Sequence, residues 1–130
     1  MEQLNNEDLF YQIALSLIPK VGPVLAKRLI AYTGSPKALF EERKRKLLKI
    51  PNIGENLVNN IKSNVIFEKA EQELSFIERY HIDVLFYLDN RYPKRLKNCE
   101  DAPVILYSKG NVNFDESRIL SIVGTRRATD

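Results

Sequence analysis

The sequence contains two nearly identical strings, I-P-K-V-G at residues 18–22 and I-P-N-I-G at residues 50–54. Each string is followed by apolar residues at helical spacing, which begin at Leu25 after the first string and at Leu57 after the second. This arrangement is typical of a pair of helix-hairpin-helix motifs. We therefore predict that the first part of the chain is a helical domain with an internal repeat.

The hairpins are candidate anion sites, because each places a glycine at the N-terminus of a helix. Free backbone N–H groups and the helix dipole favour an anion there, and glycine permits close approach and a positive φ. The first hairpin also carries three basic residues, whereas the second is poorer in charge. We expect nucleic-acid phosphate to contact Lys20, Gly22, Lys27, Arg28 and Gly54. The alternative is that both strings are structural turns.

Capping residues and apolar spacing predict the helices. A first helix begins near Asn6 and ends before Pro19, and further helices cover residues 24–32 and 37–42. No Gly or Pro occurs between residues 54 and 93, so the long helical pattern after the second hairpin is either one helix or two. Ser63-Asn64 is the place where that pattern would break.

After about residue 82 the pattern changes to strands, expected over residues 84–88, 104–107 and 119–123. The third is almost entirely apolar, which suits a strand buried on both faces of a parallel α/β sheet. Because no covering helix follows it, we expect a fragment of an α+β protein. Residues 1–82 would form a helical domain, and residues 83–130 the incomplete start of a Rossmann-like domain. Residues 119–123 would then be disordered or paired with another chain.

Composition excludes several classes of protein. The chain has 130 residues, of which 44% are hydrophobic, as expected for a globular protein. It has no membrane-spanning run and no signal peptide, so we expect a cytoplasmic protein. A single Cys99 and a single His81 leave no disulfide, no multi-Cys metal site and no His pair. No catalytic constellation stands out, so we predict neither an enzyme nor a cofactor or metal site.

Charge is distributed unevenly. Residues 19–62 contain ten Lys or Arg against three Glu, although the net charge of the chain is only +3. A basic block of this kind suggests a polyanionic partner. The alternative is that its densest run, residues 43–46, is a solvated helix face.

A loop at the end of the sequence has the composition of a phosphate cradle. Glycine gives backbone access after the apolar segment, hydroxyls donate hydrogen bonds, and arginine binds phosphate oxygens in a fork. The candidate residues are Gly124, Thr125, Arg126, Arg127 and Thr129. The loop lacks the spacing of a dinucleotide fingerprint or a P-loop, so a surface turn remains the alternative.

The motifs occur in an order that resembles the DNA-processing protein A family (DprA, also called Smf). They are Y-P-x-x-L at residues 92–96, P-x-x-L-Y-x-x-G at 103–110 and I-V-G-[ST]-R-x-x-T at 122–129. The resemblance implies a SAM-like helical domain joined to an extended Rossmann fold. It implies a non-catalytic protein that binds single-stranded DNA during natural transformation and competence and loads RecA recombinase for DNA recombination.

The resemblance also implies which residues bind DNA. In the family the G-[ST]-R loop lines a basic single-strand pocket, so Gly124, Thr125 and Arg126 carry that role here, and Thr129 matches the same motif. The family forms a homodimer, while self-association of this fragment stays open. Two alternatives remain: a helix-hairpin-helix module of a DNA repair nuclease or helicase, and a Rossmann-type enzyme that binds a nucleotide.

Overall fold

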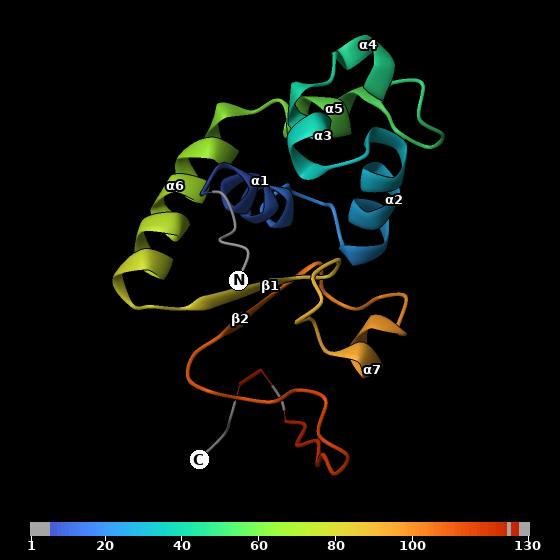
Figure 1. Ribbon diagram of the computed structural model, residues 1–130. Helices are drawn as coiled ribbons and strands as arrows, with labels where there is room; N and C mark the ends of the chain where they lie inside the picture. The colour runs from blue at the N-terminus through green and yellow to red at the C-terminus, as the bar shows by residue number, and fades with distance from the viewer. Residues whose placement is uncertain (1–5, 125, 128–130) are drawn as a thin grey trace.

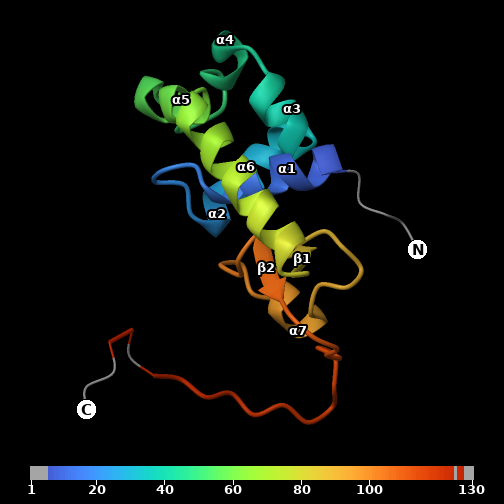
Figure 2. The same ribbon diagram turned by 90° about the vertical axis from the view of Figure 1, so that its left-hand side faces the viewer.

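The computed structural model describes residues 6–124, 126 and 127. Its helices are α1 (Asn6–Ser16), α2 (Pro23–Thr33), α3 (Pro36–Glu41), α4 (Lys44–Leu47), α5 (Glu55–Ile61), α6 (Asn64–Arg79) and α7 (Lys94–Lys97); its strands are β1 (Asp83–Phe86) and β2 (Ile105–Ser108). Helices α1–α6 lie together above the two strands, the short helix α7 lies below the strands, and the C-terminal segment runs below α7 (Figures 1 and 2). This is an α+β architecture, as predicted.

Local signals place the helix ends close to the predicted positions. Helix α2 ends at Gly34, which has φ 99° and donates its N–H to the carbonyl of Ile30 at 2.7 Å. Helix α3 begins after Ser35, whose hydroxyl accepts the N–H of Ala38. The long pattern after the second hairpin forms two helices, α5 and α6. The break lies at Lys62 and Ser63, and Ser63 caps α6 through the N–H of Val65.

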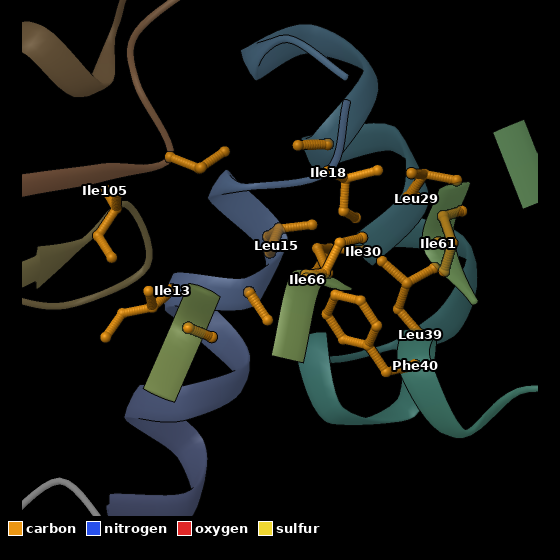
Figure 3. Close-up of a cluster of buried hydrophobic side chains, with 14 of the residues drawn as sticks. Ile13, Leu15, Ile18, Leu29, Ile30, Leu39, Phe40, Ile61, Ile66 and Ile105 are labelled. Carbon is orange, nitrogen blue, oxygen red and sulfur yellow. The ribbon is translucent and has the colours of Figure 1, made fainter. Parts of the chain in front are cut away.

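Helix α1 is the centre of the core. Four consecutive residues of this helix, Gln12–Leu15, are buried. Helix α1 packs against α6, α3 and β2. Because these elements contact it from several sides, side chains on more than one face of α1 are buried. In Figure 3, Ile13 lies on the side of Ile105 of β2, whereas Leu15 lies among side chains of the other helices. The core is therefore continuous from the helices to the first strands.

The two strands pair antiparallel, with Asp83 opposite Ser108 and Phe86 opposite Ile105. They are shifted by about one residue from the predicted ranges 84–88 and 104–107. The predicted third strand is wrong for the described structure: residues 119–123 have no regular structure. These residues are exposed, with Leu120, Ile122 and Val123 at 86%, 90% and 92% exposure. A strand that is apolar on both faces needs neighbours on both sides, and the described residues supply none.

Candidate nucleic-acid interface

The two hairpins have the same backbone geometry. In each, a proline is followed by a residue with positive φ, which is 63° at Lys20 and 66° at Asn52. The next N–H bonds back to the isoleucine before the proline, from Val21 to Ile18 and from Ile53 to Ile50. Proline followed by a left-handed residue is the signature of a type II turn. The repeat predicted from sequence is thus a repeated turn.

The two hairpin glycines lie at helix N-termini, as expected, but their backbone is not left-handed. Gly22 has φ −87° and Gly54 has φ −100°, so neither has the positive φ that the sequence argument allowed for. Each is the N-cap of the following helix, and its carbonyl accepts the first helical hydrogen bond, from Ala26 or Val58. A Cβ at either glycine would meet no atom within 4 Å. The surface above both glycines is therefore open to an approaching ligand.

The basic residues of the first hairpin face different surroundings. Lys20 and Arg28 are exposed. Lys27 is engaged inside the molecule: its Nζ donates to the carbonyl of Glu100 at 3.1 Å and lies 5.5 Å from the centre of the Tyr87 ring. The structure therefore directs the Lys27 side chain to the segment around the strands.

The second hairpin presents amides where the first presents bases. Asn52 and Gly54 are exposed, and Asn56 and Asn59 of α5 are exposed beyond them. Asn60, also on α5, donates from Nδ2 to the carbonyl of Pro19 at 3.4 Å. This contact joins α5 to the turn of the first hairpin, so the two repeats lie side by side.

The Gly124 loop lies apart from both hairpins. Gly124, Arg126 and Arg127 are exposed, and the segment that carries them lies below the strands in both views (Figures 1 and 2). Thr125 and Thr129 lie outside the described residues. A Cβ at Gly124 would meet nothing within 4 Å, which leaves the backbone accessible. The structure thus separates the two groups of candidate residues into two surfaces.

Hydrogen bonds connect the first two sequence motifs to each other and the first motif to the segment that precedes the third. The Tyr92 hydroxyl, in a side chain only 1% exposed, donates to the carbonyl of Pro103 at 2.7 Å. The N–H of Lys94 donates to Oδ1 of Asp115 at 2.9 Å, and the Arg95 guanidinium reaches the carbonyl of Ser117 at 3.5 Å. Helix α7 therefore holds the chain that leads toward the Gly124 loop.

Sequence reasoning missed two features of the basic segment. Residues 44–47 form the short helix α4, whose Leu47 is fully buried. Lys62 donates from Nζ to the carbonyl of Phe40 at 2.7 Å. Burial lowers the pKa of this ammonium group, Glu42 opposes the shift, and the like charge of Lys44 adds to it. The one sequence signal that could have indicated that α4 is anchored is the apolar Leu47 directly after the basic run.

The described part of the chain offers no other obvious centre of chemistry. Among those residues, no three His, Cys, Asp or Glu side chains are grouped to hold a metal ion. Cys99 is an exposed free thiol. No helix within the same residues has the length and apolar character that a membrane span requires.

Comparison with known proteins finds a similarity for the second part of the chain. No curated protein sequence and no solved structure matches the chain. Residues 83–130 match the family model described as DNA recombination-mediator protein A. The match begins at β1 and includes the three motifs, and it supports a role in DNA processing and recombination. The resemblance to the DNA-processing protein A family is thereby confirmed as a similarity over residues 83–130.

Proposed function

We propose that this chain is part of a recombination mediator that binds single-stranded DNA and helps to load RecA recombinase during natural transformation. The observation that carries the proposal is the family match over residues 83–130, which ends on the Gly124 loop. The exposed Arg126 and the open backbone at Gly124 support it, since both suit a phosphate that approaches from solvent. The protein acts by binding DNA and RecA in the cytoplasm, as a homodimer, and without catalysis.

The exposed apolar segment 119–123 has a place in this proposal. In the Rossmann-type fold that the resemblance implies, further strands and helices cover this apolar segment, and the Gly124 loop follows it at the edge of the sheet. Ligands of open α/β sheets bind at this edge. The high exposure of Leu120, Ile122 and Val123 supports the proposal, because such side chains need covering strands and helices.

Binding of a labelled oligothymidylate, followed by fluorescence anisotropy over a salt series, tests the proposal. We expect sequence-tolerant binding that Arg126→Ala weakens by about tenfold or more, with a log–log salt slope reduced by about 0.7 for the lost phosphate contact. Arg79→Ala, an exposed arginine on α6, is the matched control and should change neither quantity. RecA activity on single strands coated with single-strand-binding protein measures loading. Equal affinity of the Arg126→Ala and Arg79→Ala variants would contradict the proposal.

The shared turn geometry favours one second candidate, a helix-hairpin-helix module that binds duplex or junction DNA. Helix α2 begins with first-turn N–H groups that have no intrahelical partner, beside the exposed Lys20. In that case duplex DNA is preferred over single strands, and Lys20→Gln and Arg28→Gln weaken binding more than Arg126→Ala does. Turnover of a nucleotide would instead favour the Rossmann-type enzyme.

A further inference from the structure

A dense group of cations lies at the opposite end of the molecule from the Gly124 loop. It consists of Arg43, Lys44, Arg45, Lys46 and Lys49, all exposed, and we call it the α4 basic surface. The fully buried Leu47 holds α4 against the core, so these side chains project from an anchored helix. Helix α4 and the C-terminal segment lie at opposite ends in both views (Figures 1 and 2).

The charge of this surface is poorly neutralised within the molecule. Residues 43–62 contain six Lys or Arg and one Glu. The ion pair from Lys46 Nζ to Glu42 Oε1 is 3.9 Å long and exposed, and pairs of this kind contribute little. Lys62 adds a partly buried ammonium group close enough to Lys44 for the two like charges to interact. The surface therefore has a net positive potential that favours an anionic partner.

Polar groups extend the surface toward the hairpins. Lys44 and Leu48 of the α4 segment share a hollow of about 240 Å³ with Glu55 and Asn59 of α5. The next residue of α5, Asn60, bonds to the carbonyl of Pro19 in the turn that contains Lys20. Amides and cations thus follow one another from α4 across α5 to the first hairpin. Both kinds of side chain are common donors to phosphate oxygens.

The arrangement suits an extended polyanion better than a single phosphate. Successive residues of a helix are about 100° apart, so the cations of α4 fan outward and do not converge on one point. The hollow beside them is lined by Lys44 but also by the carboxylate of Glu55, which disfavours a small anion. We propose that the α4 basic surface binds the sugar-phosphate backbone of DNA, as a second contact separate from the Gly124 loop. This inference rests on the proposed function only in taking DNA as the polyanion.

Charge removal at α4 tests the inference. The triple variant Lys44→Gln, Arg45→Gln, Lys46→Gln keeps residues that favour helix and removes three charges. The matched control, Lys69→Gln, Arg79→Gln, Lys109→Gln, removes three exposed charges around α6 and β2. Anisotropy with long labelled oligothymidylate and with a duplex of equal length measures affinity against salt, and circular dichroism confirms folding. We expect the α4 variant to lose about tenfold or more in affinity and about 2 in salt slope on single strands, and the control to lose far less.

The outcomes separate this inference from the proposed function. If Arg126→Ala weakens single-strand binding while the α4 variant matches its control, the α4 inference is overturned and the proposed function stands. If DNA binding depends on α4 but is confined to duplex, the α4 contact stands and the single-strand function fails. If the folded chain binds neither DNA, both fail.

Discussion

The hydroxyl of Tyr92 donates a hydrogen bond to the carbonyl oxygen of Pro103, at 2.7 Å, across a turn and the short helix α7. The two residues belong to separate sequence motifs, and the contact brings those motifs together. Because the Tyr92 ring is almost completely buried, the motif aromatic acts as a structural anchor. A stacking role for Tyr92 on a DNA base would require the ring to leave this site.

Removing this hydroxyl should destabilise the fold. We expect Tyr92→Phe to lower the free energy of unfolding by about 1 kcal/mol, since the carbonyl of Pro103 loses a partner while the ring still fills its space. Urea unfolding followed by circular dichroism measures the change. The control is Tyr32→Phe, at a tyrosine that is 58% exposed. A loss no larger than that of the control would show that the Tyr92–Pro103 bond contributes nothing to stability.

The same tyrosine predicts how stability changes at alkaline pH. Burial raises the pKa of Tyr92 above its ordinary value of 10.0, and the nearby Cys99 adds to the shift. The folded protein then keeps the neutral phenol at a pH where the unfolded chain ionises. The resulting stabilisation is complete below pH 10 and is lost as pH rises from there through the folded pKa. Thermal unfolding from about pH 8 to about pH 11 should show a shallower alkaline decline for Tyr92→Phe than for the wild type. Equal declines would contradict this assignment.

Much of the fold could be predicted from sequence because its signals are local. Gly34, Ser35 and the break at Ser63 act through their own backbone or through residues a few positions away. The segment 119–123 could not be placed correctly, since its burial depends on strands and helices that the described residues lack. The basic residues near Gly22 predicted a DNA-binding surface that included Lys27. The contact of Lys27 with Glu100 depends on how α2 packs against a segment distant in sequence, and residue spacing does not reveal such packing.

The paired turns give a prediction about backbone strain. Lys20 and Asn52 have nearly the same left-handed φ, although asparagine tolerates this conformation better than lysine does. Lys20→Asn should therefore stabilise the protein by about 0.5 kcal/mol, and Asn52→Lys should destabilise it by a similar amount. Thermal unfolding measures both. The control is Lys20→Ala, which removes the lysine side chain but lacks the tolerance of asparagine for a left-handed φ. If Lys20→Ala raised the melting temperature as much as Lys20→Asn does, backbone strain at residue 20 would not be the cause.

Adjacent bases on α2 should separate stability from DNA binding. Lys27 bonds to the carbonyl of Glu100 and lies over the ring of Tyr87, whereas Arg28 is exposed. We expect Lys27→Gln to cost about 0.5–1 kcal/mol of stability through these lost contacts and to change DNA affinity little. Arg28→Gln should leave stability unchanged. If the first hairpin contacts DNA, Arg28→Gln should also reduce the affinity for DNA. Chemical unfolding measures the stability of the two variants, and fluorescence anisotropy measures their affinity for DNA. A larger loss of affinity for Lys27→Gln than for Arg28→Gln would contradict the prediction, because Lys27 would then leave its internal contacts to bind DNA.

The exposed segment 119–123 should make the chain self-associate. Leu120 and Ile122 are more than four-fifths exposed and lie two residues apart, so in an extended chain they point to the same side. An apolar extended segment without neighbours readily pairs with another chain. Light scattering during size-exclusion chromatography should show a mass that rises with concentration, and Leu120→Lys, Ile122→Lys should restore the monomer. Val65→Lys, at an isolated exposed valine of α6, should leave association unchanged. A wild-type chain that stays monomeric at the highest concentrations would refute the prediction, because the same side chains would then be stable in water.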